Sequence, residues 1–302
     1  MARFRKGLSD KFIARLNKEY DQGGWWKRIV SDRDLYLGIR DKSLNLYYKG
    51  NSVLRLRLAG EALKAEVHYK YLLHPEAKPT YIEFTDGRRT GTLGDELFLG
   101  ELDPAFLKRA STWYALEEKQ EVHEILRSNQ NIVDVEIALA GTLEGSERQS
   151  AKRIDFAALQ QRDNGLQLVF FEAKDFANLD LRARGAATPR VVQQIKRYEG
   201  LLRDHQTDIE KAYRVVCENL CDLDGVRKEV KSLAGRVVSG TPFSVNLFPR
   251  LVIFGFDDDQ KNGKVWRDHR AKLEDSTRGL GADRVLLRGT AKDFWGGGGG
   301  GN

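Results

Sequence analysis

Cysteine is scarce in this chain, with only Cys217 and Cys221 among 302 residues. Two cysteines are too few for a disulfide-stabilised scaffold, for a four-cysteine zinc site or for an iron–sulfur cluster. Their four-residue spacing is typical of one face of a helix, where small core residues are more common than metal ligands. We therefore expect both thiols to be packing residues in a reducing compartment.

Long apolar runs are also missing. No stretch approaches the ~18 consecutive apolar residues that a membrane span requires, and the first twenty residues carry charges throughout, unlike a secretory signal. A G-x-x-x-x-G-K-[ST] segment is absent, which excludes a P-loop ATPase, and no zinc-finger spacing occurs. These absences predict a cytoplasmic protein with no membrane partner.

The composition that remains is that of a globular protein. Hydrophobic residues make up 41% and aromatic residues 10% of the chain, and the formal net charge is +6. The length is comfortable for two domains. A mildly basic balance is compatible with a polyanionic partner such as nucleic acid.

The first third of the chain reads as an antiparallel β-rich segment behind one helix. Apolar residues at four-residue steps predict a helix over 8–20, with Ser9 as its cap. Short alternating runs broken by Gly, Asn and Asp predict strands over 34–100. We expect residues 1–105 to form a domain for substrate selection, sensing or assembly. Its many Lys and Arg residues indicate either a solvated face or a nucleic-acid groove.

The remainder reads as an α/β domain over 106–294, followed by a flexible glycine tail at 295–302. The order of the expected elements implies a mixed sheet. The expected helices are 104–128, 189–204 and 207–221. The expected strands are 132–140, 153–160, 166–174, 250–256 and 284–288.

A hairpin signal separates two of these strands. Asn164-Gly165 between strand-like runs is typical of a two-residue turn. With that turn, Asp163 pairs with Leu166, and this pairing sets the register of the whole hairpin.

The register groups three ionisable side chains. Asp155 should lie opposite Lys174, and Ala157 opposite Glu172. Because cross-strand partners and i, i+2 neighbours share a face, we expect Asp155, Glu172 and Lys174 to cluster. Two carboxylates suit Mg²⁺ or Mn²⁺, and a lysine can orient a water or stabilise negative charge. The alternative is an ordinary ion pair, although both acids interrupt apolar strands.

These residues carry a resemblance to a known superfamily. "RID" at 153–155, the hairpin and "EAK" at 172–174 resemble the PD-(D/E)xK nucleases, which have the restriction-endonuclease-like fold. "QIKRY" at 194–198 is similar to the Q-x-x-x-Y motif of one subgroup. The resemblance covers about residues 110–260, and Ile154 replaces the usual proline. It implies a mixed central sheet flanked by helices, and a metal-dependent nuclease acting on DNA in prokaryotic anti-phage defence, restriction or repair.

The resemblance also implies roles for single residues. The expected catalytic residues are Asp155, Glu172, Lys174, Gln194 and Tyr198. Gln194 and Tyr198 lie one helical turn apart, so both can reach the same group. The expected metal ligands are Asp155, Glu172 and a glutamate of the preceding helix, for which Glu121 is favoured over Glu117, Glu118 and Glu124.

A basic stretch follows the hairpin and holds no acid after Asp180 until Glu199. We expect its cations to hold the nucleic-acid backbone, although a solvated helix start is the alternative. These residues are Arg182, Arg184, Arg190, Lys196 and Arg197. The alternative function that the sequence leaves open is a catalytically inactive nucleic-acid-binding or regulatory protein. The sequence also leaves open whether the substrate is single- or double-stranded and DNA or RNA, and whether it is cut at its ends or internally. Whether two copies of the chain pair is likewise undecided.

Overall fold

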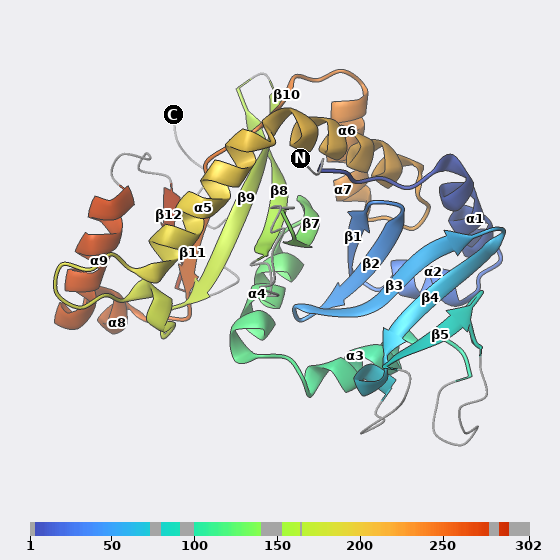
Figure 1. Cartoon of the computed structure of the whole chain (residues 1–302), viewed down its shortest axis with the longest axis horizontal. Helices are drawn as coiled ribbons and strands as arrows, with labels where there is room; N and C mark the ends of the chain where they lie inside the picture. Colours follow the sequence, from blue (N-terminus) through green and yellow to red (C-terminus); the bar gives the residue numbers. More distant parts are fainter. Residues whose placement is uncertain are drawn as a thin grey trace, which may run out of the picture.

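The computed structural model describes residues 4–72, 80–90, 100–139, 153–163, 165–277 and 284–289. Over these residues the chain is a mixed α/β protein with two sheets (Figure 1), which confirms the predicted α/β class. None of the helices in these ranges is long and apolar enough to cross a membrane. Asn164 and the glycine tail from Trp295 lie outside the described residues.

The first sheet contains strands β1 to β6 in chain order, with antiparallel neighbours. Its apolar face packs on helix α1 (Asp10–Asp21), which Ser9 caps as expected by accepting a hydrogen bond from the Phe12 amide. Helix α2 (Trp25–Val30) and the 3-10 helix η1 (Tyr69–Leu72) complete this half. The strands are Tyr36–Arg40, Ser43–Tyr48, Asn51–Ala59, Ala62–His68, Tyr81–Thr85 and Arg88–Arg89.

The second sheet is mixed, as the order of the elements predicts. Its order is β12-β11-β9-β8-β7, and β10 lies beside β9. Strands β7, β8 and β9 are antiparallel to one another, whereas β10 and β11 run parallel to β9 and β12 runs parallel to β11. The strands β7 to β12 are Ile132–Ile137, Ile154–Arg162, Gly165–Asp175, Phe243–Val245, Arg250–Phe254 and Val285–Leu287.

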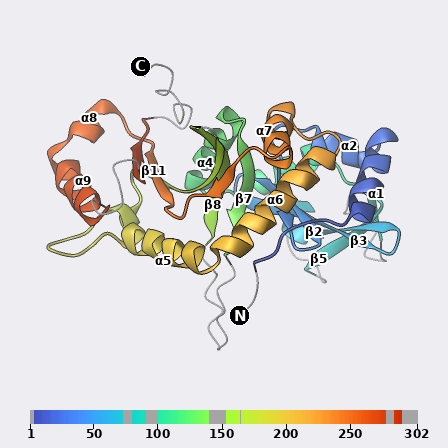
Figure 2. The ribbon, with the colours of Figure 1, turned by 90° about the horizontal axis from the view of Figure 1, so that it is seen from above.

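Helices cover both faces of the second sheet. Helix α4 (Glu117–Ser128) lies on one face, and α5 (Arg190–Asp204) and α6 (Gln206–Asp222) lie along the other (Figure 2). These two helices were expected within one or two residues of their bounds. The sequence did not indicate helices α7, α8 and α9 or strand β10. The additional helices are α7 (Lys228–Val238), α8 (Asp258–Asn262), α9 (Lys264–Thr277) and the 3-10 helix η2 (Leu179–Leu181).

The prediction of one continuous helix over 104–128 is wrong. Helix α3 (Pro104–Thr112) ends before Trp113, and α4 begins after Leu116, which has an extended backbone. The break has a physical reason. Leu107 of α3 is buried in the core of the first sheet, whereas Val122 of α4 is buried against the second sheet. The chain must turn between the two cores.

The two sheets nevertheless share apolar contacts. One buried cluster includes Phe12 and Leu16 of α1 together with Tyr213 and Val216 of α6. Helix α6 therefore packs against the N-terminal half as well as against the second sheet. In the same helix Cys217 is buried in this cluster and the half-buried Cys221 packs against it, so both are packing residues as expected.

The β8–β9 hairpin has a register two residues away from the predicted one. Arg162 pairs with Gly165, and Ala157 pairs with Phe170, so Asp163 is part of the turn and does not pair with Leu166. Asp163 has a φ of 39°, in the left-handed region. Gly165 is needed in the strand, because a Cβ there would lie 2.7 Å from the Pro242 carbonyl oxygen.

The corrected register changes the partner of Asp155. Carried one step beyond the pair Phe156 and Phe171, it sets Asp155 opposite Glu172, so the predicted pair of Asp155 with Lys174 is wrong. A shift of two residues keeps every side chain on its face, because side chains alternate with a period of two. The expected grouping on one face is therefore unaffected.

Candidate active site

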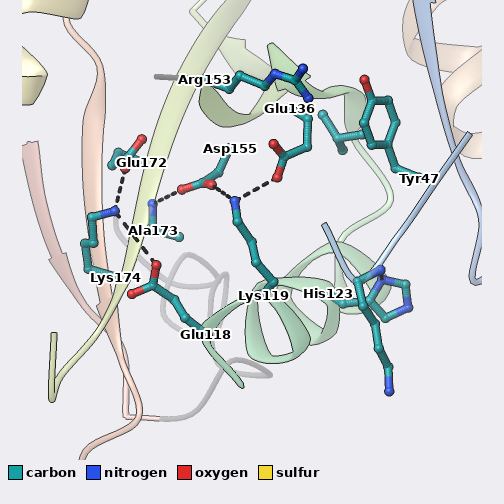
Figure 3. A network of polar contacts seen from close by, with 12 residues as sticks. Tyr47, Glu118, Lys119, His123, Glu136, Arg153, Asp155, Glu172, Ala173 and Lys174 are labelled. Atoms are coloured by element: carbon teal, nitrogen blue, oxygen red, sulfur yellow. Dashed lines mark hydrogen bonds and ion pairs between the residues drawn. The ribbon is translucent and has the colours of Figure 1, made fainter. Parts of the chain in front are cut away.

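Asp155, Glu172 and Lys174 lie together where β8 begins and β9 ends (Figure 3). The Lys174 ammonium lies 2.7 Å from a Glu172 oxygen. The backbone amide of Ala173 donates to Asp155 Oδ2 at 2.8 Å, so this carboxylate is fixed against the neighbouring strand. All three side chains are buried, with relative exposures of 6%, 2% and 9%. Burial of this much charge is costly and needs a compensating arrangement.

Helix α5 supplies the next two residues. Gln194 Nε2 donates to Glu172 Oε1 at 2.6 Å and lies 2.8 Å from the Tyr198 hydroxyl. That hydroxyl donates to the carbonyl oxygen of Arg153 at 2.9 Å. Burial and the Glu172 charge raise the pKa of Tyr198, so the phenol stays protonated. The one-turn spacing of Gln194 and Tyr198 thus brings Gln194 to Glu172 on β9 and Tyr198 to the residue that precedes β8.

The first turn of α4 contributes two more ionisable groups, Glu118 and Lys119. The Lys119 ammonium lies between two carboxylates, 2.6 Å from Asp155 Oδ1 and 2.7 Å from Glu136 Oε1. Glu118 Oε1 lies 3.8 Å from the Lys174 ammonium. We name the six residues Glu118, Lys119, Glu136, Asp155, Glu172 and Lys174 the acid–lysine cluster.

Sequence reasoning missed Glu136 and Lys119. Glu136 lies on β7, where the β7–β8 register sets it opposite Asp155, and its φ of 50° is rare for a residue with a side chain. An acid that interrupts the apolar run "IVDVEIALA" was a usable signal for Glu136. Lys119 offered no such signal, because a lysine in the first turn of a helix is usually solvated.

Glu121, the favoured third metal ligand, does not join this cluster. It faces Asp175, and burial and that neighbouring charge raise its pKa. Glu117 is exposed, and Glu124 pairs with Arg127 at 3.5 Å. Of the four glutamates considered, Glu118 is the one placed against Lys174. The predicted helix does bring a glutamate next to Lys174, but its rotation about its axis could not be read from the spacing alone.

The acid–lysine cluster has an excess of negative charge. Four carboxyl groups face two ammonium groups, so acids outnumber cations by two. Burial and the Asp155 charge raise the pKa of Glu172 to about 8. Burial alone would lower the pKa of Lys174, but the charges of Glu172 and Asp155 outweigh it and raise that pKa. The pKa of Lys119 is raised in the same way by Asp155 and Glu136.

One oxygen of the cluster is unused. Glu172 Oε2 is buried and has no hydrogen-bond partner among the described residues. An unsatisfied buried carboxylate oxygen next to excess negative charge fits a hard cation, which prefers oxygen ligands. Against this, no three His, Cys, Asp or Glu side chains of the described ranges gather as a ready-made metal site. The two lysines fill the space between the acids.

The basic residues of the following stretch divide into two groups. Arg182 is used internally, because it donates to the carbonyl oxygens of Phe176 and Asn178 at 2.7 and 3.0 Å. The other four side chains are exposed, and no ion pair of theirs is found within the described ranges. They are Arg184, Arg190, Lys196 and Arg197.

The comparisons with known proteins add no assignment. No family model, no curated protein and no solved structure matches this chain. Any functional conclusion must therefore be argued from the residues themselves.

Proposed function

We propose that the chain is a metal-dependent nuclease of the PD-(D/E)xK type that hydrolyses DNA phosphodiester bonds. The observation that carries this proposal is the contact of Glu172 with Lys174 and Gln194 beside Asp155. Residues from two strands and a separate helix meet around one buried carboxylate. An ordinary surface ion pair needs no such arrangement.

Asp155 and Glu172 are the residues that would hold Mg²⁺ or Mn²⁺, with Glu118 or Glu136 as the third acid. The unpartnered Glu172 oxygen and the excess of acids over lysines support a divalent cation here. Such an ion supplies positive charge at the scissile phosphate and lowers the pKa of a bound water. The raised pKa of Glu172 predicts that proton release from its carboxyl accompanies cation binding.

Lys174 acts as a hydrogen-bond donor in this proposal. Its raised pKa keeps the ammonium charged at neutral pH, so Nζ holds its proton. A charged donor there orients the attacking water or stabilises the negative charge that develops on the phosphate. Gln194 fixes the Glu172 carboxylate, and the protonated Tyr198 fixes Gln194.

The four exposed cations would hold the DNA backbone. On a helix with 100° per residue, Arg190 and Arg197 both lie within about 60° of Gln194, on the same side of it, so both lie beside the candidate site. Lys196 lies on the opposite side of α5 by the same rotation. Arg190 and Arg197 are therefore the better candidates for phosphate contacts near the cleaved bond, and Arg182 is not one.

A catalytically inactive nucleic-acid-binding protein is the second candidate. The Lys119 ammonium between Asp155 and Glu136 favours it, because a lysine already forms an ion pair with each of these acids. In that case the acids would be structural and no cation would be required. The two candidates differ in one expected result: only the nuclease should degrade DNA when a divalent cation is added.

A cleavage assay separates the two. Linear, circular and single-stranded DNA, and a matched RNA, are incubated with the protein with and without Mg²⁺ or Mn²⁺. We expect cation-dependent degradation of DNA by the wild type and none by Glu172→Gln, which keeps the shape of the side chain. Binding without degradation under every condition would contradict the nuclease and favour the second candidate.

A further inference from the structure

A hollow of about 550 Å³ lies between the first sheet and the start of β8. Its walls come from β2, β3, β4, β5 and η1, and Arg153 closes the side next to the acid–lysine cluster. Arg153 lies two residues before Asp155, and its charge acts on Glu136. The hollow thus opens beside the candidate active site. Its size is in the range of small-molecule sites.

The sheet presents a polar face to this hollow because of its register. Arg55 pairs with Glu66, and His68 pairs with Tyr81, so these side chains share one face. Their neighbours along the strands point the other way into the apolar core, as Leu54 and Leu56 do beside Arg55. The polar face is therefore not needed for packing the N-terminal half.

Aromatic rings gather at one end of the hollow. The His68 ring lies 5.3 Å from Tyr81 and 6.1 Å from Tyr71, measured between centroids. Tyr81 is 55% exposed although it is a large aromatic residue. Burial lowers the pKa of His68, and so does the charge of Lys70, which keeps the imidazole neutral. Accessible neutral rings are surfaces on which a nucleobase can stack.

The charge of the lining is positive. Arg55 and Arg153 are exposed, and neither has a side-chain hydrogen bond or ion pair within the described residues. Lys70 lies over the rings of Tyr71 and Tyr114. Glu66, the acid in the lining, is engaged by Arg57 at 3.0 Å. Exposed arginines next to an exposed ring match the phosphate and the base of a nucleotide.

We propose that this hollow holds an unpaired nucleotide of the DNA strand whose neighbouring phosphate lies at the acid–lysine cluster. The inference rests on the proposed nuclease function, since it names the form of the substrate at the same site. The base stacks on the exposed Tyr81 ring, with the nearly perpendicular His68 ring at its edge, and Arg55 and Arg153 contact phosphates on the way to Asp155. A duplex would hide its base faces from these rings, so the site selects single-stranded DNA.

Binding of a labelled oligothymidylate of about eight nucleotides tests the proposal, measured by fluorescence anisotropy in EDTA so that no cleavage occurs. Tyr81→Ala should weaken binding between about 5-fold and 100-fold, the range for losing one stacked base, and Tyr81→Phe should restore it. Arg55→Ala should weaken binding and flatten its salt dependence. The matched controls are Phe248→Ala and Arg28→Ala, whose side chains are also partly exposed but lie outside the hollow.

Equal affinity of wild type and Tyr81→Ala, with both proteins folded by thermal melting, would overturn the proposal. The proposal would also be overturned if the matched duplex bound more tightly than the single strand and if Tyr81→Ala did not change the affinity for that duplex. Cleavage is measured on the same proteins with Mg²⁺. Cleavage by the wild type without an effect of Tyr81→Ala on binding rejects the hollow alone. Tyr81-dependent binding without cleavage rejects the nuclease and keeps the hollow as a nucleotide site.

Discussion

Two groups of buried carboxylates on neighbouring strands of the second sheet have opposite surroundings. Asp134 on β7 is paired with Lys6 and Arg40, each at 2.6 Å, and accepts a hydrogen bond from Tyr213 at 2.8 Å. Two cations face one acid, so the local charge is positive. In the acid–lysine cluster four acids face two lysines, and the local charge is negative.

The pKa directions follow these local charges. Burial would raise the pKa of Asp134, but the charges of Arg40 and Lys6 outweigh it and lower that pKa. For Glu172, burial and the Asp155 charge act in the same direction and raise the pKa to about 8. The pKa of Lys6, like that of Asp134, is lowered: burial and the neighbouring charge of Arg40 bring it to about 8. Burial alone therefore does not identify a site, whereas an excess of buried acids over cations favours the uptake of a cation.

The two groups also differ in what they connect. Lys6 precedes α1, Arg40 belongs to β1 and Tyr213 to α6, so the Asp134 group ties the N-terminal half to the second sheet. Each Asp134 oxygen has partners, whereas Glu172 Oε2 has none among the described residues. The Asp134 group fits a structural role, and the acid–lysine cluster fits a site that takes up a cation.

The largest expected effect is on cleavage. Asp155→Ala and Glu172→Ala should each reduce DNA cleavage below detection, because each removes an oxygen donor for the cation. Their melting temperatures should stay at or above that of the wild type, since an acid leaves a cluster with excess negative charge. Plasmid cleavage across a Mg²⁺ series and thermal melting check this. Wild-type activity of either variant would contradict the functional role that distinguishes the acid–lysine cluster from the Asp134 group.

The Asp134 group should respond in the opposite way. Asp134→Ala leaves Lys6 and Arg40 without their partner and should cost about 3–5 kcal/mol of stability, the cost of breaking a buried ion pair. Urea unfolding measures this loss. A stable and fully folded Asp134→Ala protein would show that the group does not tie the two halves together.

A smaller effect separates the two lysines. Lys174→Arg keeps the charge but changes the geometry of the donor, and should slow cleavage about 100-fold with near-normal DNA binding. Lys119→Arg is the matched control, because an ion-pairing role between Asp155 and Glu136 tolerates an arginine better. Single-turnover rates measure both. Equal losses for the two variants would remove the distinction between donor and ion pair.

The smallest expected effect is the response to pH. The folded-state pKa of Glu172 lies above its usual value of 4.5, so its contribution to stability is present below about pH 4.5 and is lost as pH rises through about 8. The wild type should therefore lose at least about 1 kcal/mol relative to Glu172→Gln between pH 5 and 9. Asp134 has the opposite sign, and its contribution is lost as pH falls. Melting curves of the wild type and of Glu172→Gln across this range measure the difference. The account would be contradicted if the melting temperatures of these two proteins changed in parallel with pH.

Much of the second half could be predicted from the sequence. Strong periodicity predicted β8, β9 and α5. The i, i+4 spacing of Gln194 and Tyr198 correctly placed the two side chains together, with Gln194 on Glu172 and Tyr198 on Gln194. The hairpin turn was misplaced because the close approach of Pro242 to Gly165 is a tertiary contact that short-range turn signals do not contain. The sheet face of Asp155, Glu172 and Lys174 was still predicted correctly, because the error in the register was an even number of residues.

The parts that could not be predicted depend on three-dimensional packing. The rotation of α4 decided between Glu118 and Glu121, and the spacing of acids on that helix does not fix it. Lys119 reaches Asp155 around the end of the sheet, a contact between residues 36 apart in sequence. The break between α3 and α4 depends on which core each helix joins.

The central claim is that the acid–lysine cluster takes up a divalent cation that the Asp134 group does not need. Calorimetric titration of Mn²⁺ into the wild type and into Glu172→Gln at neutral pH tests it most directly. We predict saturable binding by the wild type, with proton release, and loss of that binding in Glu172→Gln. Absence of binding by the wild type, or equal binding by both proteins, would contradict the account.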